Sequence, residues 1–246
     1  MKKFSDLMPF TNPATRREEK DIAKMARKVL MLHGIAQTGE YFYHKTKGLR
    51  TELENLGYEL CYPTANNKMS PADVPDGASD EVVASGVDDV LTWIYADAAK
   101  ADYSILPSTL DYLRQYVIDN GPFEGLIGFS QGAGVGGYLM TDFNAILNLT
   151  PEQQPPFRFF IAFSGFKFQP LKYQSQYADH PISVPSLHVQ GELDTVTESE
   201  KVQGLYEACT PETRTFVSHP GGHYVPNSRG FARKVTEWLK SVDSTL

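Results

Sequence analysis

Residues 125–134 read Gly-Leu-Ile-Gly-Phe-Ser-Gln-Gly-Ala-Gly, and this stretch decides the fold that we expect. Its first half, through Phe129, is an apolar run typical of a buried strand, and apolar side chains recur at helical spacing after Ser130. A strand that passes directly into a helix strains the residue between them, and glycines at positions 128 and 132 leave room for that turn. The pattern Gly-x-Ser-x-Gly therefore predicts a nucleophile elbow, with Ser130 beside a helix N-terminus that favours negative charge.

The composition is that of a globular enzyme-sized domain. The chain has 246 residues, of which 41% are hydrophobic and 22% charged, and this length suits one undivided α/β domain. The formal net charge of −7 argues against partners that are polyanions, such as nucleic acids and anionic membranes. No apolar run approaches the ~20 residues that a membrane-spanning helix needs.

The cysteines and the N-terminal segment bear on the cellular compartment. Cys61 and Cys209 lack metal-ligand spacing, and they indicate either two buried free thiols in a reducing compartment or a single disulfide. Residues 1–27 are rich in basic side chains but have no apolar core of a secretory signal, and their four acids argue against an organelle-targeting segment. We therefore expect a flexible or helical tail and a cytoplasmic protein.

Strand-like and helix-like segments alternate along the rest of the chain. The expected strands cover residues 29–32, 58–62, 126–129, 157–163, 184–189 and 214–218. The expected helices cover residues 46–56, 106–118, 131–147, 198–208 and 228–242. This alternation predicts a mostly parallel sheet covered by helices on both faces, within a single domain at 28–246.

One long segment, residues 63–90, breaks the alternation. It contains Pro71, Pro75 and Gly77, which disfavour helix, and six acidic side chains against a single lysine. A long irregular segment in a compact domain is usually functional, so these residues form either a lid over the site or a disordered acidic surface loop.

Three residues downstream of strands complete a catalytic constellation. Ser130, Asp194 and His223 each follow the end of an expected strand, so all three lie at one edge of the sheet. They also occur in the order serine, acid, histidine that α/β-hydrolases use. We therefore predict that they form a catalytic triad.

Other residues compete for these roles. Glu192 is an alternative acid, but Asp194 lies further along the loop, where the chain turns back toward the site. His219 ends a strand and is expected to be structural, and His33, after the first strand, is expected to shape the oxyanion loop. The six histidines lack ligand spacings such as His-x-x-x-His, so the sequence predicts no metal site.

A dinucleotide-binding fingerprint overlaps the elbow. Residues 132–137 satisfy Gly-x-Gly-x-x-Gly, but the acidic residue expected about 20 positions later is not found at the end of the next strand. Glu152, the nearest by count, lies among prolines before that strand. We therefore attribute the glycines to close packing of the helix on the sheet, and we expect no cofactor.

Four motifs resemble one known family. They are Leu-His-Gly at 32–34 with Gln37, Gly-Pro-Phe-Glu-Gly at 121–125, Gly-Phe-Ser-Gln-Gly-Ala at 128–133, and His-Pro-Gly-Gly-His-Tyr-Val-Pro-Asn at 219–227. The chain resembles, over residues 28–240, the fungal family of serine hydrolases (FSH family). These α/β-hydrolases are related to acyl-protein thioesterases and polyketide-releasing thioesterases. The resemblance implies the same triad, with the backbone N–H groups of Ile35 and Gln131 as the oxyanion hole.

The predicted chemistry is hydrolysis of an acyl ester or thioester through an acyl-enzyme. Aromatic residues are candidates for an apolar acyl pocket, although each is also a candidate for the core: Tyr41, Phe42, Trp93, Tyr95, Phe166 and Tyr224. The partner is then a small acyl substrate, and the sequence leaves the oligomeric state open. The alternative is an α/β-hydrolase-fold ligand-binding module with an idle triad.

Overall fold

The computed structural model describes residues 27–69, 90–97 and 102–243. Six parallel strands form the central sheet in the order β10-β9-β8-β7-β1-β2. Their bounds are β1 Arg27–Leu32, β2 Tyr58–Cys61, β7 Gly125–Phe129, β8 Phe159–Phe163, β9 Ser186–Gly191 and β10 Arg214–His219. The predicted parallel sheet is confirmed, and Arg27, which the sequence analysis assigned to the tail, begins β1.

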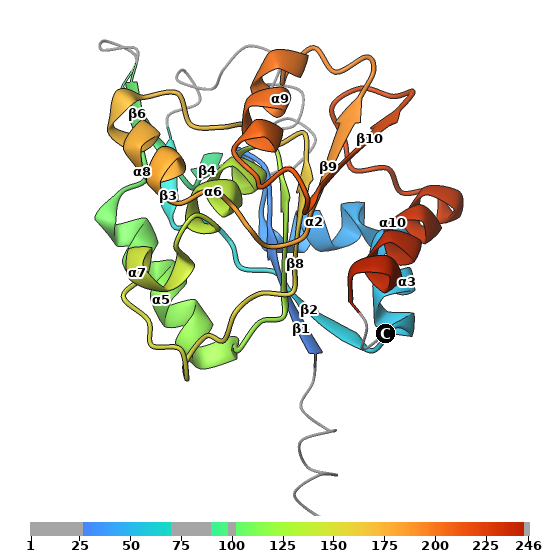
Figure 1. Ribbon diagram of the computed structural model, residues 1–246, viewed down its shortest axis with the longest axis horizontal. Coiled ribbons are helices and arrows are strands. Elements are labelled where there is room, and N and C mark those ends of the chain that lie inside the picture. The colour runs from blue at the N-terminus through green and yellow to red at the C-terminus, as the bar shows by residue number, and fades with distance from the viewer. Residues whose placement is uncertain (1–26, 70–89, 98–101, 244–246) are drawn as a thin grey trace, which may run out of the picture.

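Helices cover both faces of this sheet (Figure 1). One face carries α5 Pro107–Asn120, α6 Gln131–Leu139 and α9 Ser199–Glu207, whose apolar side chains share a core with Leu30 and Leu126. The other face carries α2 Gly39–Lys45, α3 Lys47–Asn55 and α10 Arg229–Val242, packed on Val29 and Ile127. Alternate residues of β1 and β7 therefore belong to different cores, as a sheet buried on both sides requires.

Shorter elements occur along the chain between the strands of the central sheet. Two antiparallel hairpins pair β3 Asn67–Met69 with β4 Val90–Thr92, and β5 Tyr95–Asp97 with β6 Asp102–Ser104. Three short helical segments follow α6: α7 Phe143–Ile146, the 3₁₀ helix η3 Leu171–Tyr173 and α8 Gln174–Asp179. The candidate lid falls mostly on residues 70–89, which lie outside the described residues, as do residues 1–26.

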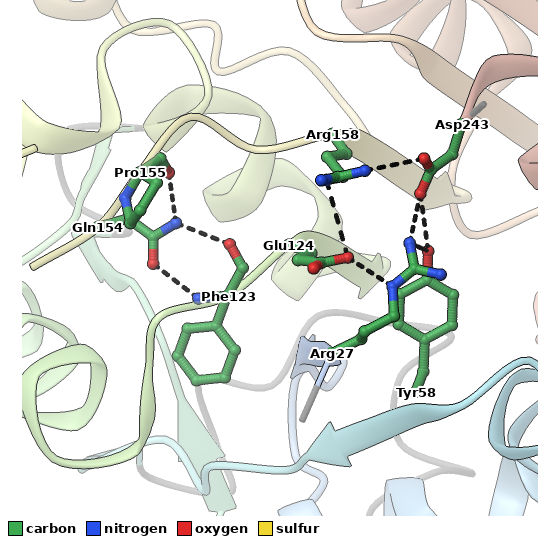
Figure 2. A network of polar contacts seen from close by, with 8 residues as sticks. All are labelled: Arg27, Tyr58, Phe123, Glu124, Gln154, Pro155, Arg158 and Asp243. Atoms are coloured by element: carbon green, nitrogen blue, oxygen red, sulfur yellow. Dashed lines mark hydrogen bonds and ion pairs between the residues drawn. The ribbon is translucent and has the colours of Figure 1, made fainter. Parts of the chain in front are cut away.

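A polar network joins the chain's first strand to its last helix (Figure 2). Arg27 donates to Glu124 at 2.8 Å and also pairs with Asp243, the C-cap residue that follows α10. Arg158 donates to the other oxygen of Asp243 at 3.0 Å. Glu124 and Arg158 precede β7 and β8, so this network lies at the amino edge of the sheet.

A second contact in Figure 2 fixes the chain just before β7. The buried amide of Gln154 accepts from Phe123 N–H at 2.9 Å and donates to Phe123 O at 2.8 Å. Polar contacts therefore stabilise the amino edge of the sheet, and the candidate site lies at the opposite, carboxyl edge. Within the described ranges, no helix is both long and apolar enough to cross a bilayer.

The order of the strands places the candidate site. Strand β2 lies on one side of β1, whereas β8, β9 and β10 follow β7 toward the opposite edge of the sheet. The direction in which strands are added therefore reverses between β1 and β7, which pair directly. In open α/β sheets, ligands bind outside the carboxyl ends of the strands at such a reversal. The loop after β1 and Ser130 after β7 flank this position.

Candidate active site

Ser130 connects β7 to α6 in a conformation that few residues adopt. Its φ of 51° and ψ of −117° lie outside the usual regions for an L-residue. Its N–H donates to Phe163 O at 2.8 Å, which attaches the junction to the end of β8. The side chain is almost buried, with 6% of the residue exposed. The elbow expected from the sequence is therefore present.

The two glycines of the motif are required by close contacts. A Cβ at Gly128 would lie 2.5 Å from Ala133 Cα, and one at Gly132 would lie 2.3 Å from Leu32 O. Real Cβ atoms essentially never approach other atoms so closely. The turn and the approach of α6 to β1 therefore both depend on the absence of side chains.

Asp194 and His223 come from two loops that are hydrogen-bonded to each other. In the loop after β9, Glu192 N–H donates to His219 O at 2.8 Å, and Leu193 N–H donates to Gly221 O at 3.0 Å. These bonds join it to the loop after β10. His223 Nδ1 then lies 2.9 Å from Asp194 Oδ2.

The carboxylate of Asp194 is fully buried and well supplied with donors. Its Oδ1 accepts from Val196 N–H at 3.0 Å and Thr197 N–H at 2.9 Å. Burial acts to raise the pKa of Asp194, but hydrogen bonds from His223, Thr197 and Ser164 lower it, and the pKa lies below its ordinary value. Asp194 is thus an anion that accepts from His223 Nδ1–H, and this bond leaves Nε2 of the ring unprotonated.

The imidazole lies at the strand end that carries the serine. The ring of His223 packs on the ring of Phe129, with 4.8 Å between centroids, and Phe129 directly precedes Ser130. No hydrogen bond joins Ser130 Oγ to His223 among the described residues. In substrate-free enzymes this contact is often long and tightens when substrate binds.

The loop after β1 leaves one backbone donor uncommitted. Gly34 N–H donates to Gln37 Oε1 at 3.1 Å, Gln37 N–H to Gly34 O at 3.4 Å, and Ala36 N–H to Leu91 O at 2.8 Å. Ala36 has a φ of 61°, which turns the loop sharply. Among the described residues, the N–H of Ile35 has no acceptor, unlike its three neighbours in the loop. This donor is therefore available to a ligand.

The N–H of Gln131 is available for a different reason. Gln131 is the first residue of α6, and the first four N–H groups of a helix have no carbonyl within the helix to bind. Because the positive end of the helix dipole lies at the same place, this N–H suits a developing negative charge.

A buried histidine fixes the loop after β1 through hydrogen bonds. Ala65 N–H donates to His33 Nε2 at 2.9 Å, so the proton lies on Nδ1, which donates to Gly34 O at 2.7 Å. Burial lowers the pKa of His33 to about 4, so the ring is neutral near pH 7. His33 is thus a structural residue of the loop and not the base.

Nothing in the sequence pattern indicated the connection between Gln131 and the end of β4. The buried Oε1 of Gln131 accepts from Trp93 N–H at 2.7 Å and from Thr92 Oγ1 at 3.0 Å. Trp93 Nε1 in turn donates to His33 O at 2.9 Å. The elbow and the oxyanion loop are therefore bridged by residues from a third part of the chain.

Ser164 is a second residue that the sequence reasoning missed. It is buried directly after β8, has a φ of 47°, and its hydroxyl helps to lower the pKa of Asp194. Its place just past a buried strand is the same signal that singled out Ser130 and Asp194.

A cavity of about 350 Å³ opens beside the constellation. Three of the aromatic residues predicted to bind substrate line it, namely Tyr41, Phe42 and Tyr224. The other lining residues are Gln37, His44, Lys45, Phe129, Val225 and Asn227. Phe129, one of the lining residues, also packs on the ring of His223, so the cavity lies next to the predicted site residues.

The remaining aromatic candidates lie elsewhere. Trp93 is completely buried and contacts the rings of His33 and Tyr112, so it belongs to the core beneath the oxyanion loop instead of an open acyl pocket. Phe166 packs near Gly134 of α6 and on Phe168, outside this cavity.

The competing residues and motifs have structural roles. The buried ring of His219 accepts from Gly221 N–H at 3.2 Å and packs on Tyr224. Glu192 is exposed and accepts from Ser218.

The glycines of α6 allow tight packing, as predicted, since a Cβ at Gly136 would lie 2.6 Å from Leu126. Within the described part of the chain, no three His, Cys, Asp or Glu side chains are grouped to hold a metal ion.

Both cysteines are free thiols, the first of the two alternatives drawn from the sequence. Cys209 is buried, whereas Cys61 is partly exposed. No disulfide therefore contributes to the stability of this fold.

Comparison with known proteins points to one family. The family described as Serine hydrolase (FSH1) matches residues 23–235. Family of serine hydrolases 2 of Saccharomyces cerevisiae is 60% identical over 223 residues, covering 89% of this chain and 100% of the relative. Family of serine hydrolases 3 of the same yeast is 45% identical over 227 residues, covering 89% of this chain and 85% of the relative.

A solved structure supports the fold assignment. The acyl-protein thioesterase 2 of Zea mays superposes with a TM-score of 0.55 at 17% identity, covering 87% of this chain and 93% of the thioesterase. The parallel sheet, the helices on both faces and this likeness identify an α/β-hydrolase fold. By its fold and by the family match over most of its length, this chain is a member of the FSH1 family of serine hydrolases.

Proposed function

We propose that this protein is a carboxylic ester or thioester hydrolase in which Ser130, Asp194 and His223 form the catalytic triad. The observation that carries the proposal is the hydrogen bond of 2.9 Å between His223 Nδ1 and buried Asp194, next to a serine held at a φ of 51°. The serine hydrolase family of the chain supports the general chemistry. The thioesterase likeness supports an acyl substrate.

The first half-reaction forms an acyl-enzyme. His223 Nε2 takes the proton of Ser130 as Oγ attacks the substrate carbonyl carbon, and Asp194 stabilises the imidazolium. The carbonyl oxygen becomes an anion that accepts from the N–H groups of Ile35 and Gln131. The tetrahedral adduct then expels the alcohol or thiol, which takes the proton from His223.

The second half-reaction releases the acid. His223 removes a proton from water as the water oxygen attacks the acyl-enzyme, and the same N–H groups hold the second oxyanion. Collapse of this adduct returns the proton to Ser130 Oγ and frees the carboxylic acid. Removal of one oxyanion donor costs roughly 10²–10³ in rate in known hydrolases.

The cavity gives an expectation for substrate size. Its volume of about 350 Å³ is near the lower end of the range of about 300–1,000 Å³ for small-molecule sites. We therefore expect short acyl groups to be preferred. The two free thiols are consistent with action in the reducing cytoplasm.

The test is turnover of p-nitrophenyl esters and acyl thioesters of increasing chain length, by wild type and by Ser130→Ala. Wild type is expected to hydrolyse short-chain substrates, and Ser130→Ala is expected to lose nearly all activity. A folded wild-type protein that turns over none of these substrates would instead fit a ligand-binding module. Equal turnover by both proteins would remove Ser130 from the mechanism.

A further inference from the structure

The cavity beside the triad has a charge character opposite to that of the whole chain. The protein has a formal net charge of −7, with 30 acidic and 23 basic side chains. Yet the nine residues that line this cavity include Lys45 and His44 and no carboxylate. A cavity with a cation and no acid favours an anionic ligand over a neutral ligand of the same shape.

Among the described residues, Lys45 has no anionic partner. No carboxylate of the described residues lies within ion-pair distance of its ammonium group. The ammonium instead lies 5.1 Å from the ring centroid of Tyr41, another wall of the cavity. This contact keeps the exposed ammonium beside the ring of Tyr41 at a wall of the cavity, where it is able to meet an anionic ligand.

The position of Lys45 in α2 explains only part of this arrangement. Cations in the last turn of a helix interact favourably with its dipole, and Lys45 is the last residue of α2. The dipole does not account for a cavity wall without carboxylates. It also does not account for the nearness of the cavity to His223, whose ring packs on the lining residue Phe129.

The opposite wall of the cavity is held in place by a separate contact. Asn227, at the end of the loop that carries His223 and Tyr224, accepts from Gly48 N–H through Oδ1. Gly48 lies in the first turn of α3, immediately after α2. The loop and α2 are therefore positioned relative to each other before substrate binds, which reduces the entropy cost of binding.

We propose that Lys45 forms an anion subsite and that the preferred substrates are short acyl esters or thioesters carrying a second, negatively charged group. The inference rests on the proposed function, because it requires the reacting carbonyl to lie at Ser130. The charged group belongs either to the acyl part, as the free carboxylate of a dicarboxylic half-ester, or to the leaving group, as a phosphate.

The first arm of the test varies charge on the acyl group. Monomethyl glutarate is compared with methyl 5-methylhexanoate, whose isopropyl end has the shape of a carboxylate without its charge, and methanol release is measured. The second arm varies charge on the leaving group by comparing acetyl-coenzyme A with acetyl-N-acetylcysteamine. Each arm yields a ratio of kcat/KM, anionic over neutral, for each protein variant.

The variants are Lys45→Met and the matched control Lys47→Met. Both remove one positive charge from an exposed side chain, but Lys47, at the start of α3, does not line the cavity. Lys45→Met is expected to lower the ratio about 5- to 10-fold in one arm, the arm whose charged group lies where the natural substrate carries its charge. Lys47→Met is expected to change the ratio less than twofold. Raising NaCl to 0.5 M is expected to lower the ratio in wild type but not in Lys45→Met.

The outcomes separate this inference from the proposed function. Hydrolysis of the neutral substrates with a ratio that Lys45→Met leaves unchanged in both arms, or that both variants change equally, overturns the anion subsite and leaves the hydrolase intact. No turnover of any of the four substrates by wild type contradicts the hydrolase function itself, and the subsite with it.

Discussion

Ser130 holds a backbone conformation that costs free energy, and its surroundings compensate for that cost. A non-glycine residue in such a region costs of order 1–3 kcal/mol and persists only when neighbouring structure determines it. Here β7 and α6 fix the backbone on both sides of Ser130, and the N–H of Ser130 donates to Phe163 O. This conformation keeps the Oγ of Ser130 at the edge of the sheet, beside the N–H of Gln131.

Asp194 and Glu192 provide a direct comparison of two carboxylates in one loop. Asp194→Asn is expected to lower kcat about 10³–10⁴-fold, because an amide cannot hold the tautomer of His223 that leaves Nε2 as the base. Glu192→Gln, which removes a charge from an exposed side chain, is expected to change kcat less than threefold. Steady-state kinetics with a short-chain ester test this, and equal losses in the two variants would contradict the assignment.

At the scale of elements, α6 packs closely on the sheet because glycines lie at the points of contact. Gly132 touches the carbonyl end of β1, and a Cβ there would lie 2.3 Å from Leu32 O and 2.4 Å from His33 O. Because these are backbone atoms of a buried strand end, they cannot move aside without disturbing the oxyanion loop. The position of the nucleophile therefore depends on Gly132.

Gly132→Ala is expected to lower the free energy of unfolding by about 3 kcal/mol or more, or to prevent folding. The matched control is Gly230→Ala in α10, where an added Cβ meets nothing within 4 Å. That variant is expected to raise stability by less than about 1 kcal/mol. Urea unfolding followed by circular dichroism measures both, and wild-type stability of Gly132→Ala would contradict the packing argument.

The elements that the sequence predicted are those with strong periodicity. All six strands of the central sheet and the helices α3, α5, α9 and α10 were expected within a few residues of their bounds. The helix after Ser130 ends at Leu139, earlier than expected, because Thr141 Oγ1 binds Tyr138 O and Asp142 caps the separate helix α7. Such local side-chain bonds compete with helical continuation and leave no mark on the apolar pattern.

The elements that the sequence missed are short or polar. Helix α2 has only seven residues and depends on Thr38, whose hydroxyl accepts from Tyr41 N–H at 3.0 Å. The β3–β4 and β5–β6 hairpins have three residues in each strand, too few for a periodic signal. The role of Trp93 was missed for a related reason, since its partners Gln131 and His33 lie far away in sequence.

At the scale of the whole molecule, two fully buried histidines link stability to pH. Burial lowers the pKa of His33 to about 4, and burial followed by the charge of Arg214 lowers that of His188 to about 3. Near pH 7 both rings are neutral in the folded and unfolded states. Below pH 6.5 the unfolded chain binds protons at these sites, whereas the folded chain does not until its lower pKa values are reached.

The free energy of unfolding is therefore expected to fall as pH falls from 6.5 toward 4, by up to about 1 kcal/mol per pH unit for each histidine. Urea unfolding at pH 7, 6 and 5 measures this slope. His188→Asn should make the slope shallower, whereas His180→Asn, at an exposed position, should leave it unchanged. Constant stability between pH 7 and pH 5 would contradict the assignment of neutral buried rings.

The two edges of the sheet have different roles in the whole molecule. The amino edge carries the Arg27–Glu124–Arg158–Asp243 network, which ties β1 to the end of α10 (Figure 2). The carboxyl edge carries the loops that follow β1, β7, β8, β9 and β10, and these loops hold the candidate site residues. The sequence predicted this gathering for Ser130, Asp194 and His223, because each follows a strand and parallel strands end at one edge.

The central claim is that Ser130 is an activated nucleophile, and covalent labelling tests it most directly. The protein is treated with a fluorophosphonate, and the adduct is located by mass spectrometry of its peptides, alongside Ser130→Ala and the control Ser218→Ala at an exposed serine. We predict one adduct on Ser130 in wild type and Ser218→Ala, and none in Ser130→Ala. Equal labelling of Ser130→Ala, or an adduct on another residue in wild type, would contradict the account.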